Sequence, residues 1–153
     1  MSNRLLRCKG FTISIAKGWD DITATLDDAD APLTVAHPAH GVGALQFSPA
    51  IYRSGLDPQV GPQDLSELLD EFASNQGLDD PFDRSAYSGE VIIEGASFHA
   101  GDDFIRAWYA SDGKNVILCT YVCDWDNRFR EVSEREMAVQ SIHFSRKDAK
   151  RDR

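Results

Sequence analysis

Residues 104–123, FIRAWYASDGKNVILCTYVC, carry the strongest structural signal in the sequence. Both halves of this stretch are rich in β-branched and aromatic residues, which favour strands. Between the halves stands Asp112-Gly113, a pair typical of the type I′ turn that joins antiparallel strands. We therefore expect a hairpin here, with a long or broken strand in 97–110 and a second strand in 115–123.

Alternation in the first half of this hairpin separates its side chains into two faces, because residues two positions apart share one face of a strand. One face holds Ile105, Ala107 and Tyr109 and suits a core. The other face holds Phe104, Arg106 and Trp108. An arginine between two rings is typical of a binding hot spot, so we expect this second face to meet solvent or a partner. The alternative is a half-exposed aromatic ladder that serves only the sheet.

Outward from the hairpin, the sequence predicts further strands and two helices. Alternating or β-rich segments predict strands at 11–15, 19–26, 33–36, 43–48 and 87–94. Apolar residues recur at helical spacing from Leu65 to Ala73, with Pro62 near the first turn and Gly77 at the stop. A second helix is expected within 127–140.

The order of these elements indicates the fold class. Helices do not alternate with strands, and the connections are hairpin-like, so we expect an α+β protein with one antiparallel sheet flanked by helices. The chain has 153 residues, which suits one domain. We place that domain at 1–145 and expect a frayed basic tail at 146–153.

The charge distribution narrows the classes of partner. The chain has 16 Lys+Arg and 25 Asp+Glu, a net charge of −9. The tail RKDAKRDR carries a net +3, so the first 145 residues, with 11 basic and 23 acidic, carry −12. Such a body lacks the cations that sequence-independent nucleic-acid binding needs. It favours encounter with a protein that has a basic surface.

The N-terminal segment and the cysteines indicate the compartment. Residues 1–9 hold only Leu5-Leu6 between charges, too little for a signal peptide. No apolar run approaches the roughly 18 residues of a membrane span. Cys119 and Cys123 stand four strand residues apart, too far for a disulfide. We therefore expect a cytoplasmic protein with reduced thiols and no membrane insertion.

Candidate chemical groups are few. His37 and His40 flank a Pro-Ala pair, and no further ligands for a metal lie near them in sequence. His99 stands near two aspartates, Asp102 and Asp103, an arrangement that leaves a general acid–base role open. No nucleophile motif or phosphate-binding loop accompanies these groups. We expect no catalytic residue, no metal and no cofactor.

Further candidates for partner binding lie in the loops. Trp125 follows the last long strand and is a second aromatic candidate. Acidic pairs at Asp79/Asp80 and Asp124/Asp126 lack calcium-loop spacing, and aspartates in turns also have local backbone roles. We interpret these five residues, with the face of Phe104, as candidates for contact with a protein. An exposed sheet edge would also allow a homodimer.

The whole pattern resembles a known fold. An F-x-I-x-I strand and a Gly-Trp turn lie in 11–19, and G-x-L-Q-F-S in 43–48 precedes the Leu-rich helix. The R-A-W-Y, D-G and V-I-L-C-T-Y motifs follow in 106–121. Over about 10–144 the chain looks like the α/β/α sandwich of the PsbP proteins and a Ran-binding import factor. It is also similar to bacterial DcrB-like proteins, including adaptors for type VI secretion effectors.

The resemblance implies a non-catalytic binding protein, since no catalytic residues transfer with it. Small bacterial proteins of this kind are encoded beside toxins, as immunity proteins or loading adaptors. Our first hypothesis is an immunity protein that occludes a toxin or secreted effector with a basic surface. The second is a secretion adaptor that shields hydrophobic segments and would need an apolar groove. The third is a small-molecule carrier or enzyme, which would need a deep pocket.

Overall fold

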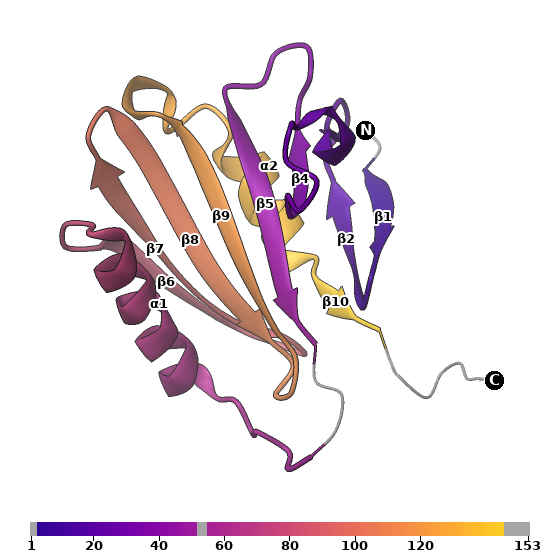
Figure 1. Cartoon of the computed structure of the whole chain (residues 1–153), viewed down its shortest axis with the longest axis vertical. Coiled ribbons are helices and arrows are strands. Elements are labelled where there is room, and N and C mark those ends of the chain that lie inside the picture. The colour runs from indigo at the N-terminus through magenta and orange to yellow at the C-terminus, as the bar shows by residue number, and fades with distance from the viewer. Residues whose placement is uncertain (1–2, 52–54, 146–153) are drawn as a thin grey trace.

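The computed structural model describes residues 3–51 and 55–145. Two antiparallel sheets and two α-helices account for most of this part of the chain (Figure 1). The large sheet has the strand order β3-β4-β5-β9-β8-β7-β6, and the small sheet has the order β1-β2-β10. The α+β class expected from the sequence is confirmed.

The elements have the following bounds. The large sheet is built from β3 (Asp20–Asp21), β4 (Leu33–Ala36), β5 (Gly43–Ala50), β6 (Phe82–Ser88), β7 (Ile92–Ala100), β8 (Asp103–Ser111) and β9 (Val116–Asp124). The small sheet is built from β1 (Arg4–Cys8), β2 (Phe11–Ile15) and β10 (His143–Phe144). The helices are α1 (Pro62–Gln76), α2 (Val132–Gln140) and the short 3-10 turns η1 (Thr23–Thr25) and η2 (Trp125–Asn127).

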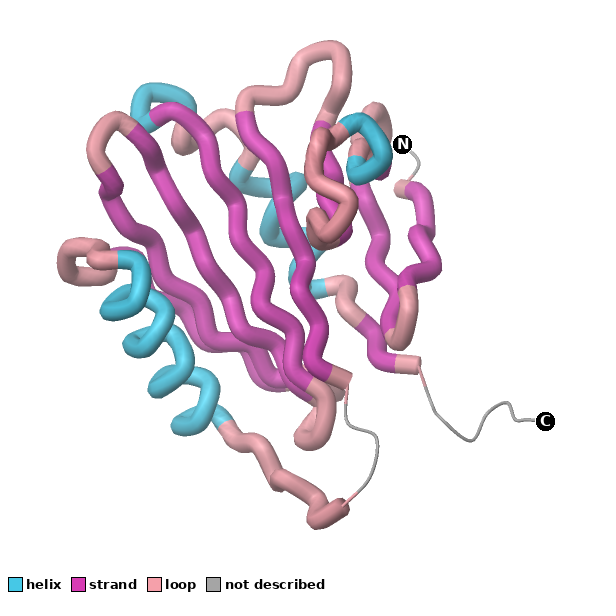
Figure 2. The backbone as a smooth tube through the Cα atoms, viewed as in Figure 1, coloured by secondary structure: helices cyan, strands magenta, loops and turns pink. Residues whose placement is uncertain are grey.

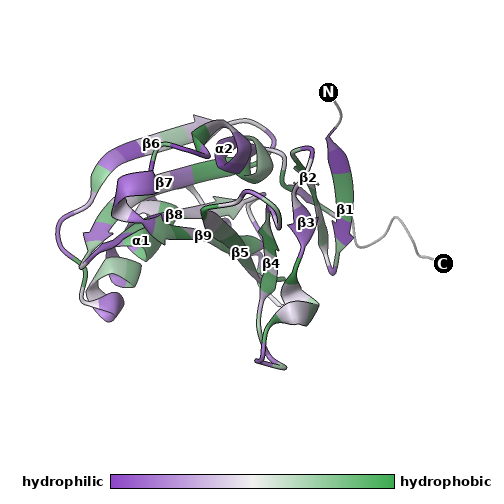
Figure 3. Cartoon of the chain, turned by 90° about the horizontal axis from the view of Figure 1, so that it is seen from above, coloured by the Kyte–Doolittle hydropathy of each residue, from purple (hydrophilic) through white to green (hydrophobic). Residues whose placement is uncertain are grey.

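The large sheet separates two apolar cores. On one face, α1 packs against β7 and β8 through Leu69, Phe72, Ala96, Phe98 and Ala107. On the other face, α2 and the small sheet cover a larger core, with α2 packed on β2. Figure 3 shows the two helices on opposite sides of the curved sheet. The layer order is therefore helix, sheet, then helix with small sheet.

The sequence signals around α1 are confirmed. Pro62 is the first helical residue, and the Asp64 carboxylate accepts a hydrogen bond from the Gly61 N–H at 2.8 Å. Gly77 ends the helix with φ = 65°, a left-handed conformation that glycine adopts without strain. Leu65 and Leu69 are buried beneath the helix.

The long hairpins β7–β8–β9 form the middle of the sheet (Figure 2). The hairpin expected around Asp112-Gly113 is confirmed, but its turn is not type I′. Four residues separate β8 from β9, and only Gly113 among them has a positive φ, at 103°. The Asp112 carboxylate instead accepts the backbone N–H groups of Lys114 and Asn115.

Two strands differ from the sequence-based expectation. The strand expected at 87–94 is two strands, β6 and β7, parted by the turn at Gly89. The segment 97–110, expected to be one long strand or a broken one, is broken at Gly101, where φ is 63°. In 19–26 only Asp20–Asp21 form a strand, because the Asp21 carboxylate accepts the N–H of Thr23 and the chain turns into η1.

The elements near the two ends of the described chain include β1 and α2. β1 was not expected, because its apolar pair Leu5-Leu6 is flanked by arginines; it pairs with β2 around Gly10, where φ is 91°. The second helix expected within 127–140 is confirmed as α2, Val132–Gln140. The basic tail expected at 146–153 lies outside the described residues. No helix within them is long and apolar enough to cross a membrane.

Candidate protein-binding surface

The face of β8 expected to meet solvent is buried. Phe104, Arg106 and Trp108 are all 3% exposed or less. The expectation failed because α2 and β6 fold over this face and supply polar partners for the arginine. These three side chains belong to the interior of the described structure rather than to its surface.

Arg106 is held by hydrogen bonds from three elements. Its Nε donates to Glu136 of α2 at 3.0 Å, and one terminal nitrogen donates to the Asp83 carbonyl and the Ser97 hydroxyl, both at 2.8 Å. The other terminal nitrogen donates to the Ser85 hydroxyl at 2.7 Å. A buried guanidinium is tolerated only when its donors are matched in this way. Arg106 therefore joins β6, β7 and α2 to β8.

Glu136 has a second partner in the same region. Its carboxylate also accepts the indole N–H of Trp108 at 3.3 Å. A glycine on the neighbouring strand makes room for both side chains. A Cβ atom on Gly95 would lie 2.7 Å from the Trp108 ring and 3.1 Å from Arg106.

A second buried polar group lies between β9 and α2. The Glu131 carboxylate accepts the Tyr121 hydroxyl at 2.6 Å and the backbone N–H of Gly43 at 3.2 Å. Burial raises the pKa of Tyr121, and the hydrogen bond to Glu131 raises it further. Arg135, 4% exposed, places its guanidinium 4.7 Å from the Tyr121 ring and 5.0 Å from the Phe104 ring. These contacts fix the start of α2.

Beyond this interior, four side chains form a column at the end of the sheet. The His99 imidazole stacks on the Trp125 indole with centroids 3.7 Å apart and planes 13° apart. The Arg128 guanidinium lies 3.9 Å from the same indole and 4.6 Å from the Phe129 ring. We call His99, Trp125, Arg128 and Phe129 the aromatic column.

The column rests on the core and ends at the surface. Phe82 and Phe104 pack against Trp125 with centroids 6.0 and 6.1 Å away. The Arg128 guanidinium also donates to the Trp125 carbonyl at 2.7 Å, which holds the turn closed. At the outer end, Phe129 is 75% exposed. A large apolar ring is thus presented to solvent on a fixed support.

Acidic residues surround this end of the sheet. The β7–β8 and β9–α2 connections lie at this end of the sheet (Figure 1), and the α1–β6 loop leads into Phe82, whose ring packs on Trp125. These loops contribute six exposed aspartates, which we call the acidic collar: Asp79, Asp80, Asp102, Asp103, Asp124 and Asp126. Asp103 and Asp124 are direct cross-strand neighbours. Like charges placed opposite each other destabilise a sheet.

Five of the sequence-based candidates for partner binding belong to the aromatic column or the acidic collar. Trp125 is half-buried in the column rather than fully exposed, and Asp79, Asp80, Asp124 and Asp126 belong to the collar. Their contact with a partner stays a prediction. Phe129 and the stacking of His99 were missed. For Phe129 the signal was the Arg128-Phe129-Arg130 run, which begins three residues after Trp125, since a phenylalanine flanked by two arginines is poorly suited to a buried position.

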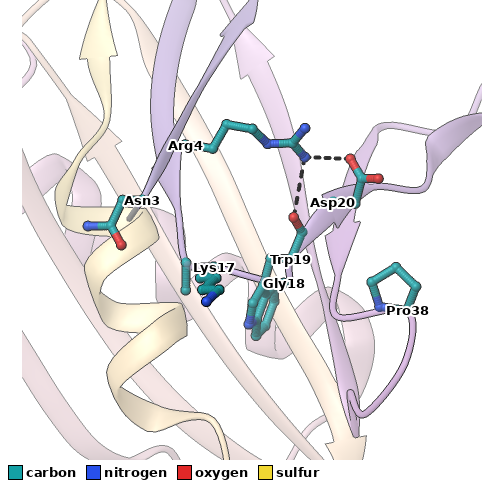
Figure 4. Close-up of a pocket in the computed structure, with 8 residues that line it drawn as sticks. Asn3, Arg4, Lys17, Gly18, Trp19, Asp20 and Pro38 are labelled. Atoms are coloured by element: carbon teal, nitrogen blue, oxygen red, sulfur yellow. Dashed lines mark hydrogen bonds and ion pairs between the residues drawn. The ribbon is translucent and has the colours of Figure 1, made fainter. Parts of the chain in front are cut away.

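The surface also has a pocket, which shares no residue with the aromatic column. A cavity of about 530 Å³ is lined by Asn3, Arg4, Ala16, Lys17, Gly18, Trp19, Asp20 and Pro38 (Figure 4). Arg4 donates to both the Asp20 carboxylate and the Trp19 carbonyl. The Arg4 hydrogen bond lowers the pKa of Asp20. Arg4 and Asp20 are therefore already paired with each other, and Lys17 is the third charged residue of the lining.

The histidine and cysteine candidates form no cluster. The His37 and His40 rings lie 5.3 Å apart, and the described residues contain no group of three His, Cys, Asp or Glu placed to hold a metal. Cys8, Cys119 and Cys123 are free thiols, as expected for the last two.

Comparison with solved structures shows what this fold is similar to. The Ran-binding protein Mog1p of Saccharomyces cerevisiae matches with a TM-score of 0.64 and 7% identity, over 94% of this chain and 96% of that one. PsbP (CyanoP) of Synechocystis sp. PCC 6803 matches with a TM-score of 0.58 and 12% identity, over 94% and 93% of the two chains. These likenesses confirm a PsbP-like fold.

A third match extends beyond this chain. A protein of Bacteroides thetaiotaomicron VPI-5482 matches with a TM-score of 0.59 and 13% identity over 90% of this chain, which spans 46% of that protein's length. No protein-family model and no curated protein sequence matches the chain. At identities this low, the likeness shows the fold alone.

Proposed function

We propose that this chain is a non-catalytic protein-binding protein, specifically a bacterial immunity protein that binds and occludes a toxin with a basic surface. The observation that carries the proposal is the exposed Phe129 ring at the end of the aromatic column, inside the acidic collar. Binding hot spots combine an aromatic anchor with arginine and a surrounding polar rim. The column and collar have that composition.

The rigidity of the column supports a binding role. The Arg128 guanidinium lies over Trp125, which itself packs on buried Phe104, and the Phe129 ring contacts that guanidinium. A preorganised anchor loses little conformational entropy when it enters a partner's pocket. Free phenylalanine rings on flexible loops lack this advantage.

The charge of the collar indicates the partner's chemistry. None of its six carboxylates makes an ion pair with a cation in the described part of the chain. The sheet also tolerates the repulsion between Asp103 and Asp124. A partner with lysines or arginines around an apolar pocket would relieve that repulsion and accelerate encounter. One structural neighbour, Mog1p, is described as Ran-binding, so a protein-binding role has a precedent on this fold.

The other two hypotheses have less support. A secretion adaptor for hydrophobic segments needs a contiguous apolar groove, whereas the exposed large apolar residues of the described chain are scattered over several elements: Leu5, Leu26, Leu56, Phe82, Tyr87, Val122, Phe129 and Val132. A small-molecule enzyme needs convergent reactive groups, and the pocket at Arg4 and Asp20 offers an already paired set.

Co-expression tests the proposal. The chain is produced in a bacterial host together with the product of the gene adjacent to its own. The wild type should restore growth and co-purify with that product. Phe129→Asp should lose protection and weaken binding at least tenfold, whereas Tyr87→Asp, a matched change of another exposed ring on β6, should keep both.

Two results would overturn the proposal. If the wild type neither binds nor protects against the neighbour's product, the immunity role is wrong. If Tyr87→Asp impairs binding as much as Phe129→Asp, the surface is wrongly placed. The melting temperatures of both variants should lie within a few degrees of that of the wild type, so that unfolding does not explain a loss of binding or protection.

A further inference from the structure

One half of the large sheet's outer face is not covered by a helix. On that face α1 packs on β7 and β8, with no comparable packing on β9 or β5. Cross-strand pairs on these two strands, Ala44 with Val122 and Gln46 with Thr120, point to this side. We call Ala44, Gln46, Ser48, Thr120 and Val122 the open strip.

The two faces of β5 and β9 differ sharply in burial. Leu45, Phe47, Cys119 and Tyr121 are 0% exposed on the inner face. On the outer face every residue of the open strip retains solvent access, and Val122 is 42% exposed on a central strand. An antiparallel sheet can leave one face to solvent, but here α1 covers only part of the outer face, so the exposed Val122 lies beside a helical layer that ends at β8.

The width of the strip fits one helix. Neighbouring strands lie about 4.8 Å apart, so two strands present a width of about 10 Å. An α-helix with its side chains is about 10 Å in diameter. α1 already covers two strands in this way with its 15 residues. A second helix of similar length, placed beside α1, would complete the layer.

Acidic residues stand on both sides of the strip. On the α1 side, Asp70 is turned toward β6, where it pairs with Arg84 at 2.8 Å. Glu71, the next residue, points about 100° further around the helix. It lies toward Tyr109 on β8, because burial raises the pKa of Tyr109 and the charge of Glu71 raises it further. Asp64, seven residues earlier, shares that side of the helix.

The opposite side is formed by the loop between η1 and β4. Figure 3 shows this loop and α1 projecting from the same side of the sheet, with β9 and β5 between them. The loop carries Asp27, Asp28 and Asp30, all exposed. A helix lying on the strip would thus pass between two acidic walls.

We propose that the open strip docks an amphipathic helix of about 15 residues from a partner protein, with small or aliphatic residues toward Thr120 and Val122 and lysines or arginines along both edges. The small and polar side chains of the strip allow close approach, and the walls select for positive charge. This proposal is independent of the aromatic column.

Synthetic helical peptides of 15 residues test it. The first has a leucine-alanine face and lysines elsewhere, the second replaces every lysine with glutamate, and the third replaces them with serine. Binding to the full chain is measured by fluorescence anisotropy and mapped by NMR chemical shifts. The lysine peptide should bind with shifts centred on the strip, and the other two should bind at least tenfold more weakly.

Matched variants assign the binding to the strip. Val122→Lys should weaken binding of the lysine peptide at least tenfold. Leu5→Lys changes another exposed aliphatic residue, on β1, in the same way and should weaken that binding less than twofold. Three results would overturn the proposal. The two variants could weaken binding of the lysine peptide equally, the serine peptide could bind as tightly as the lysine peptide, or the lysine peptide could fail to bind. Phe129→Asp should leave the lysine peptide bound, so failure of the immunity role and failure of this docking site are distinguishable.

Discussion

The hydroxyl of Tyr121 donates a 2.6 Å hydrogen bond to the carboxylate of Glu131, the residue that precedes α2. Tyr121 belongs to a central strand, and Glu131 also receives the backbone N–H groups of Val42 and Gly43. One carboxylate therefore joins β9, the start of β5 and the start of α2. Because Trp125, Arg128 and Phe129 lie in the connection between β9 and α2, this hydrogen bond also fixes both ends of the segment that carries the aromatic column.

Tyr121→Phe is expected to reduce the free energy of unfolding by about 1.5–3 kcal/mol, since a hydrogen bond to a charged group is lost while the ring remains. Urea denaturation measures the change. Tyr87→Phe removes an exposed hydroxyl and should change stability by less than about 0.5 kcal/mol. Similar losses in the two variants would contradict a role for the Glu131 bond.

Arg106→Met is expected to cost about 3–5 kcal/mol, because it leaves the buried Ser97 hydroxyl and the partly buried acceptors on β6 and α2, including the Glu136 carboxylate, without their donor. Arg84→Met, which breaks the exposed pair with Asp70, should cost at most about 1 kcal/mol. Chemical denaturation of both variants checks the difference. If Arg106→Met is as mild as Arg84→Met, Arg106 is not the link between α2 and the sheet.

Stability is expected to fall as pH rises above about 9. Burial raises the pKa of the Cys119 thiol, and burial together with the Glu131 hydrogen bond raises that of Tyr121. In this range the unfolded chain releases protons that the folded chain retains, so each group lowers the free energy of unfolding by up to about 1.4 kcal/mol per pH unit. Denaturation midpoints between pH 8 and 11 measure the slope.

The Tyr121→Phe variant provides the control for this pH dependence. It removes one of the two groups, so its stability should decline less steeply above pH 10 than that of the wild type. A wild-type midpoint that stays constant up to pH 11 would contradict the buried, protonated state of both groups.

The fold could be predicted largely from local patterns. Alternation at Phe11–Ile15 predicted a strand with one buried face, and helical spacing from Leu65 to Ala73 predicted a helix with one buried face. Where turn signals were weaker, the breaks were harder to place: the turn at Gly89 was missed, and at Gly101 the sequence left a long strand and a broken one equally open. Single glycines inside β-rich sequence do not reveal on their own that the chain reverses.

The surface was harder to predict, for a physical reason visible at Arg106. A charged residue on a strand normally indicates an exposed face, because an unpaired buried charge is costly. Here the pairing groups, Glu136 and the carbonyl of Asp83, come from elements 30 and 23 residues away. The sequence of β8 contains no trace of them. The acidic loops, by contrast, could be found because their exposure depends on composition alone.

The intrinsic fluorescence of Trp125 can report on binding at this surface. Of the three tryptophans, Trp19 and Trp108 are 5% and 1% exposed, so their emission is insulated from events at the surface. Trp125 is half-buried in the aromatic column and borders water. The Arg128 guanidinium contacts both this indole and the Phe129 ring, so we expect a protein that covers Phe129 and Arg128 to change the indole's surroundings. Docking can therefore be followed as a blue shift of intrinsic fluorescence, without a label and without knowing the partner beforehand.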